Sequence, residues 1–259
     1  MSDDRVLLAL DGSIATITLN RPDKLNALDP SMLDRLDEIT LRLDRDPTVR
    51  VVLLTATGDR AFCVGADITA WSALEPLDIW RRWVRDGHRV FNAFACLRQP
   101  TIAVLNGYTF GGGLELALAA DLRLAAAGIE LAAPEVKIGT LPGWGGTERL
   151  TQLIGPARAK QLVFTGARID AATAERWGLV NEVVARDQLD IRARAVAAEI
   201  AANAPISVQL AKQAIDGALG ENLAIALEAM AGALAASTKD GREGVASFKE
   251  KRPARFTGL

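Results

Sequence analysis

The chain has 259 residues, of which 49 % are hydrophobic and 24 % are charged, and its net charge at pH 7 is −2. This composition is typical of a globular protein with a sizeable core, built as one large domain or as a domain with a smaller appendage. The near-neutral charge gives no support for nucleic acid or an anionic membrane surface as a partner. No stretch of about 18 residues lacks charges, so no membrane span is expected.

Cysteine and histidine are too scarce for several kinds of chemistry. The two cysteines, Cys63 and Cys96, cannot form a disulfide framework or a metal cluster. The single histidine, His88, leaves little for a His-based metal site or a Ser-His-Asp triad. The N-terminal segment is acidic, and its apolar run is too short for a secretory signal. We therefore expect a cytoplasmic protein without a metal.

The first part of the chain is predicted to form strand, strand, helix and strand. Two apolar runs, residues 6–10 and 15–19, flank an Asp-Gly-Ser turn and indicate a hairpin. Asp29 and the proline after it are the N-cap and first position of an amphipathic helix that ends near Arg45. Residues 49–56 form a continuous apolar run, typical of a strand covered on both faces.

The next segment combines a possible backbone site with a tryptophan-rich helix. Residues 65–67, Gly-Ala-Asp, form a turn in which backbone N–H groups could be left without a partner, although most such turns are only turns. Residues 75–97 have helical periodicity, and Trp71, Trp80 and Trp83 lie in or just before this helix. Core packing explains these tryptophans well, but they could also wall a ligand pocket.

A glycine triplet lies at the centre of the sequence. Residues 101–105 form an apolar strand, Gly111, Gly112 and Gly113 follow, and an apolar helix begins directly after them. The first N–H groups of a helix lack intrahelical partners, so this position suits an oxygen that carries or acquires negative charge. Glu115 lies in the first turn of this apolar and therefore buried helix, where it could be functional or could only complement the helix dipole.

A second glycine-rich segment follows two short predicted strands, residues 122–126 and 129–132. It carries Glu135, and a glutamate after a proline is most often solvated unless its loop folds back over the glycine triplet. From about residue 187 the chain is helical and rich in alanine and leucine, so we place a boundary between residues 1–186 and 187–259. The basic ending, residues 247–256, is interpreted as an exposed tail.

Three motifs now stand in order: AFCVGADI (residues 61–68), NGYTFGGGLELALAAD (106–121) and APEVKIGTLPGWGGTERL (133–150). Together they resemble the enoyl-CoA hydratase/isomerase (crotonase) superfamily, and the resemblance runs essentially the full length of the chain. It implies an α/β fold, a crotonase-like spiral of ββα units that forms an acyl-CoA-binding core over residues 1–186. A C-terminal helical region over residues 187–259 would then drive assembly into a homotrimer or hexamer.

The resemblance also implies how a thioester would be held. Its carbonyl oxygen would lie between two backbone N–H groups, those of Ala66 and Gly112, which form an oxyanion hole. Each preorganised donor is worth about 3–4 kcal/mol in the transition state. Coenzyme A would enter only as part of the acyl-CoA substrate, with no separate cofactor.

Glu115 and Glu135 match the two glutamates of hydratases in this family. By resemblance Glu115 activates the water and Glu135 supplies the proton to the α-carbon, with its pKa raised by burial. Trp144 occupies a position where a small residue is frequent, and its indole could face the pocket and restrict acyl length or face outward and only pack. The remaining matches are predicted substrate contacts: Lys24, Ala61, Ile68, Gly143 and Lys249.

The leading interpretation is hydration of 2-enoyl-CoA thioesters to 3-hydroxyacyl-CoA. An enoyl-CoA isomerase or a pathway-specific acyl-CoA dehydratase would share the same glutamates. A catalytically silent CoA-binding protein is the alternative from another class. Retention of both glutamates and all three glycines speaks against that alternative.

Overall fold

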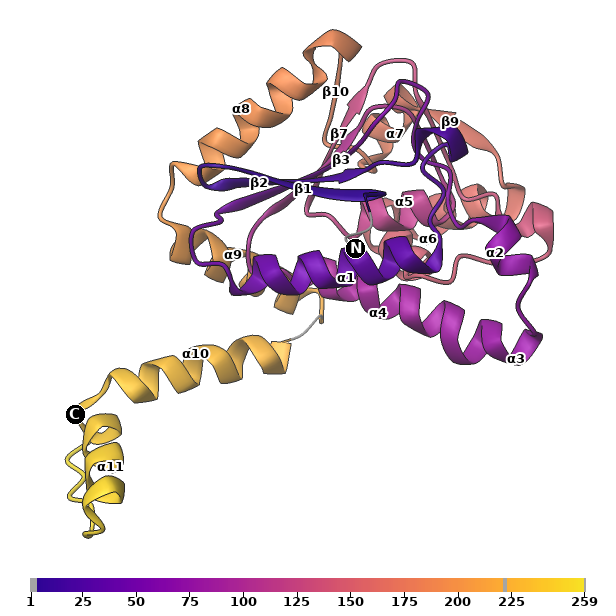
Figure 1. Cartoon of the computed structure of the whole chain (residues 1–259). Helices are drawn as coiled ribbons and strands as arrows, with labels where there is room; N and C mark the ends of the chain where they lie inside the picture. Colours follow the sequence, from indigo (N-terminus) through magenta and orange to yellow (C-terminus); the bar gives the residue numbers. More distant parts are fainter. Residues whose placement is uncertain (1–3, 221–222, 259) are drawn as a thin grey trace. The chain divides into compact units, whose positions relative to one another are not determined.

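The computed structural model describes residues 4–220 and 223–258 (Figure 1). The chain divides into two compact units, Met1–Val208 and Gln209–Leu259. The boundary that the sequence suggests at residue 187 falls inside the first unit, where a short 3-10 helix, Arg186–Gln188, leads into α8 (Leu189–Ala201). Helix α8 packs on strands of the large sheet through Leu189 and three alanines one turn apart.

The large sheet of the first unit has six strands in the order β1-β2-β3-β5-β7-β10. The strands β1 and β2 form the predicted antiparallel hairpin, with Val6 opposite Leu19, and all other neighbours are parallel. The central strands are buried on both faces, as their continuous apolar runs predict. The strands are β1 (Val6–Asp11), β2 (Ile14–Leu19), β3 (Val51–Ala56), β5 (Thr101–Leu105), β7 (Leu122–Ala126) and β10 (Glu182–Val184).

A second sheet of four very short strands has the order β4-β6-β8-β9. The chain visits the two sheets alternately: β3 is followed by β4, β5 by β6, and β7 by β8, and helices follow each pair. This alternation confirms the predicted spiral of ββα units. The strands of this sheet are β4 (Ala61–Cys63), β6 (Tyr108–Phe110), β8 (Glu130–Ala132) and β9 (Arg168–Asp170).

The helices of the first unit largely follow the sequence signals. The Asp29 side chain accepts a hydrogen bond from the Met32 N–H at 3.0 Å and caps α1, which confirms the predicted N-cap. The long helix predicted over residues 75–97 is instead divided by a π-helical turn, Ile79–Trp83. The helices are α1 (Pro30–Arg45), α2 (Ile68–Ser72), α3 (Pro76–Asp78), α4 (Val84–Ala95), α5 (Gly112–Leu118), α6 (Gly146–Thr165) and α7 (Ala171–Trp177), with further 3-10 helices at Pro22–Lys24 and Glu135–Ile138.

Helices α9 (Pro205–Ala218), α10 (Leu223–Ser237) and α11 (Lys239–Glu250) end the chain, and α9 crosses the boundary between the units. The expectation that residues 247–256 are exposed is confirmed for most of them, although residues 247–250 complete α11 and Ser247 is buried. After α11 the chain returns along the helix, and the Asp240 carboxylate accepts the N–H groups of Thr257 and Gly258. No helix in the described part of the chain is long and apolar enough to cross a membrane.

Candidate active site

Three parallel strands of the small sheet bring the sequence motifs together. Ala66 follows β4, Gly112 follows β6 and Glu135 follows β8, and these three strands are neighbours in the sheet. Parallel strands end at the same edge, which is where α/β sheets bind ligands. The loop after β8 does fold back over the glycine triplet, since a Cβ placed on Gly111 would be 3.2 Å from Oε1 of Glu135.

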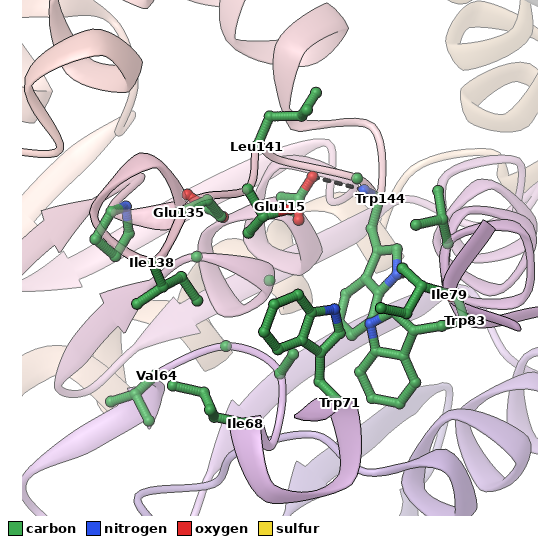
Figure 2. A pocket seen from close by; sticks show the side chains of 18 of the residues that line it. Val64, Ile68, Trp71, Ile79, Trp83, Glu115, Glu135, Ile138, Leu141 and Trp144 are labelled. Carbon is green, nitrogen blue, oxygen red and sulfur yellow. Dashed lines mark hydrogen bonds between the residues drawn. The ribbon is translucent and has the colours of Figure 1, made fainter. Parts of the chain in front are cut away.

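A cavity of about 230 Å³ opens at this edge. Figure 2 shows Glu115 near its centre, with Val64, Ile68, Glu135 and Ile138 to one side. Trp71, Ile79, Trp83 and Trp144 lie on the other side, which we call the aromatic end. Most lining residues are therefore apolar, and those with polar side chains are Glu115, Glu135, Lys137, Thr140 and the tryptophans.

The backbone N–H groups of Ala66 and Gly112 lie close together on the cavity wall. A Cβ placed on Gly112 would be 3.4 Å from the Ala66 nitrogen. Leu28 pairs with the residues on either side of Ala66, donating to the Gly65 carbonyl at 2.8 Å and accepting from the Asp67 N–H at 2.7 Å. Neither the Ala66 nor the Gly112 N–H donates to another described residue. The two N–H groups are therefore near each other and available to a common acceptor in the cavity.

Each glycine of the triplet is required by a different constraint. Gly111 has φ 53° and ψ −129°, a conformation that residues with a Cβ rarely adopt. A Cβ on Gly112 would lie 2.6 Å from Cζ3 of Trp144, and one on Gly113 would lie 2.2 Å from the Cys63 carbonyl oxygen. The triplet thus allows α5 to start tightly against β4 with its first N–H groups facing the cavity.

Glu115 is buried in the first turn of α5, yet its carboxylate is hydrogen-bonded. Oε1 accepts the backbone N–H groups of Trp144 at 2.7 Å and Gly146 at 2.8 Å. Burial, followed by repulsion from Glu135, raises the pKa of Glu115 to about 7. The two N–H donors and the nearby Arg149 act in the opposite direction and favour the ionised form.

Glu135 differs from Glu115 in its hydrogen bonding. Both of its carboxyl oxygens are buried, and neither meets a hydrogen-bond donor of another described residue. Burial raises its pKa as well. Two carboxyl groups that face one cavity do not both ionise readily, because the charge on one opposes the charge on the other. The two backbone donors and Arg149 favour the charged form of Glu115, whereas the Glu135 carboxyl meets no donor of another described residue.

The question of where Trp144 faces has a clear answer. Its indole is only 2 % exposed and forms part of the cavity wall at the aromatic end (Figure 2). The ring packs against Trp83 with centroids 5.4 Å apart and against Phe91 edge-on at 5.2 Å. Trp144 therefore both faces the pocket and packs, and its backbone N–H holds Glu115.

Comparison with known proteins shows the family of the chain. The sequence matches the model of the Enoyl-CoA hydratase/isomerase family over residues 10–258. The chain belongs to this family. It is 38 % identical to a short-chain-enoyl-CoA hydratase of Clostridium acetobutylicum over 97 % of each chain, and 36 % identical to a crotonyl-CoA hydratase of Syntrophomonas wolfei over 99 % of each. The crystal structure of an enoyl-CoA hydratase from Bacillus anthracis superposes with a TM-score of 0.82 at 37 % identity, covering 99 % of this chain and 100 % of that one.

The other residues predicted from the family resemblance lie in different places. Ile68 and Gly143 line the cavity. Ala61 is buried in β4, its carbonyl accepts from the Asn26 side chain, and it is not part of the cavity wall. Lys24 is exposed in its 3-10 helix, and Lys249 lies on α11 of the second unit. Their contacts with coenzyme A stay predictions.

An ion pair that the motifs alone did not indicate lies next to Ala66. Arg21 donates to the Asp67 carboxylate at 2.7 Å and to the Ala27 carbonyl at 3.0 Å, and its bond lowers the pKa of Asp67. Asp67 also caps α2. Arg21 therefore connects the segment around Ala27 to the turn that contains Ala66 and Asp67. Nothing in the spacing of Arg21 and Asp67, which are 46 positions apart, indicates this pairing from the sequence alone.

Proposed function

We propose that this chain hydrates 2-enoyl-CoA thioesters to 3-hydroxyacyl-CoA. The observation that carries the proposal is the pair of buried glutamates in unlike environments beside two backbone donors. Relatives named as hydratases of short-chain enoyl-CoA and crotonyl-CoA support the same activity. Coenzyme A enters as part of the substrate, and no other cofactor is invoked.

The thioester oxygen accepts the N–H groups of Ala66 and Gly112, which stabilise the negative charge that develops on it when water adds. Glu115, as the carboxylate, accepts a proton from the water that attacks the β-carbon. Glu135, as the carboxylic acid, delivers its proton to the α-carbon. The proton gained by Glu115 and the proton lost by Glu135 balance the addition of one water across the double bond.

The direct test is the decrease in absorbance of the conjugated thioester when purified protein is mixed with crotonyl-CoA. The product should be identified as 3-hydroxybutanoyl-CoA, and the Glu115→Gln/Glu135→Gln variant serves as the inactive control. An isomerase would instead convert 3-enoyl-CoA into the conjugated isomer without adding water. A CoA-binding protein without catalytic activity would bind butanoyl-CoA in a calorimeter and leave crotonyl-CoA unchanged.

We further infer that the helical C-terminal region supports a homotrimer or hexamer. Leu227 and Leu234 lie seven residues apart on one face of α10 and are 54 % and 70 % exposed in the single chain. Large exposed apolar side chains on one helix face are typical of subunit interfaces.

A further inference from the structure

Gly87 lies where a helix gains nothing from glycine. It occupies the interior of α4, where glycine is less favourable than alanine, and its φ is not positive. A Cβ placed on Gly87 would be 2.2 Å from Nε1 and 2.3 Å from Cε2 of Trp144. The missing side chain therefore makes room for the indole of Trp144.

The indole of Trp144 is fixed by a hydrogen bond, by an aromatic neighbour and by two closely approaching glycines. Its Nε1 donates to the Trp83 carbonyl at 3.2 Å, and Phe91 packs edge-on against it. On the opposite side from Gly87, Cζ3 approaches the second close glycine, Gly112, where a Cβ would be only 2.6 Å away. Interiors packed this closely do not adjust without strain, so the indole forms a fixed wall.

The position of this wall matters for the acyl group. The Gly112 N–H is one of the two donors proposed to hold the thioester oxygen, and the indole touches this same residue. Figure 2 shows Trp83 and Trp144 of the aromatic end across the cavity from Glu135 and Ile138, with Glu115 between. An acyl chain with its oxygen at the donors and its β-carbon at the carboxylates thus extends toward the aromatic end.

We propose that Gly87 and Trp144 are a matched specificity-determining pair: Gly87 admits the indole, and the indole closes the acyl pocket to all but short chains of about four to six carbons. The substrate class rests on the function proposed above. Length selection is separable from catalysis here, because Trp144 holds Glu115 through its backbone N–H and not through its side chain.

The test compares kcat/KM for four-carbon and ten-carbon 2-enoyl-CoA in four variants: Trp144→Ala, Trp144→Phe, Gly87→Ala and the double Gly87→Ala/Trp144→Phe. Trp80→Ala is the control for loss of a tryptophan, since Trp80 lies in the π-helical turn before α4, is 62 % exposed and does not line the cavity. Wild type should strongly prefer the four-carbon substrate. Trp144→Ala should raise the ratio of ten-carbon to four-carbon kcat/KM by at least about tenfold, the size of effect that pocket methylenes produce. Trp144→Phe should raise it less, and the control should leave it unchanged.

Gly87→Ala supplies the second, independent readout. The methyl group should push the indole into the pocket and lower four-carbon kcat/KM by about tenfold or more. It should also lower the Tm, although replacing a helix-interior glycine by alanine otherwise stabilises a protein. The smaller ring of Trp144→Phe should restore most of the activity to the double variant, as expected for two residues in contact.

An unchanged chain-length ratio in both Trp144 variants would overturn the proposal, and so would wild-type behaviour of Gly87→Ala. If no substrate of any length is hydrated, the proposed function fails, and calorimetric affinities for butanoyl-CoA and decanoyl-CoA then replace kcat/KM in the same comparison. If Trp144→Ala does not fold, Trp144→Phe alone decides the ratio.

Discussion

The two glutamates can be assigned their separate roles by single glutamine substitutions. In Glu115→Gln the amide oxygen can still accept the N–H groups of Trp144 and Gly146, so the loop around the carboxylate should stay in place. What is lost is the proton acceptor. In Glu135→Gln the side chain keeps its size but can no longer deliver a proton, and no described residue compensates. One positioned acid or base accelerates a reaction by about 10²–10⁴-fold, so kcat of each variant should fall by that factor.

The double variant should lose much less than the product of the two single losses. Groups that act together on one water are strongly non-additive, because removing either one already disables the pathway they share. Turnover is followed by the absorbance of crotonyl-CoA, and binding of butanoyl-CoA is measured by calorimetry alongside. Binding should survive in all three variants within about tenfold, since neither carboxylate is proposed to hold the coenzyme.

Exchange of the α-hydrogen of 3-hydroxybutanoyl-CoA in D₂O distinguishes the two roles. Glu135 is the group proposed to act on the α-carbon, so exchange should persist in Glu115→Gln and drop by about 100-fold or more in Glu135→Gln. Exchange that fails only in Glu115→Gln would reverse the assignment. Hydration close to the wild-type rate in either single variant would refute the two-carboxylate mechanism altogether.

Three further outcomes are expected. Gly112→Val should cost about 10²–10³-fold in kcat, the value of one oxyanion donor, whereas Ala66→Ser keeps its N–H and should remain within about tenfold; equal losses in both would argue against backbone donors. Because burial raises the pKa of Glu115 to about 7 from about 4.5, the folded chain retains a proton there that the unfolded chain releases, so stability falls as the pH rises through this window. The Tm of Glu115→Gln relative to wild type should therefore increase between pH 4.5 and 8, and a pH-independent difference would contradict the raised pKa. Light scattering should give a trimer or hexamer, and a monodisperse monomer of 27.6 kDa would exclude the proposed assembly.

The parts of the fold with strong local signals were predictable from the sequence. The hairpin of β1 and β2, the capped start of α1 and the buried strands β3 and β5 all have clear periodicity or turn chemistry. The three-residue strands β4, β6 and β9 were not predicted, because so few residues cannot show an alternating pattern. Such strands exist only because the spiral places them next to their neighbours.

The candidate site also has parts that the sequence predicts and parts that it does not. The motifs pointed to Ala66, Gly112, Glu115 and Glu135 through their resemblance to a family, and the structure brings all four to one cavity. The orientation of Trp144 could not be decided from its own neighbours in sequence, because it depends on Gly87, which lies 57 positions earlier. A glycine inside an amphipathic helix was the one available sign that a large group approaches that helix closely.

The site relies on backbone groups wherever negative charge has to be held. The thioester oxygen is proposed to meet the N–H groups of Ala66 and Gly112, and the Glu115 carboxylate already meets those of Trp144 and Gly146. A backbone donor survives a change of side chain, so residues at such positions can vary without loss of the donor. Trp144 shows the consequence: its N–H group donates to Glu115, whereas its buried indole lines the cavity and is the group proposed to limit the acyl chain. Substitutions of Trp144 should therefore change the preferred acyl length more readily than the reaction catalysed. They also require a residue that matches the new side chain at the position of Gly87 of α4, which faces the ring.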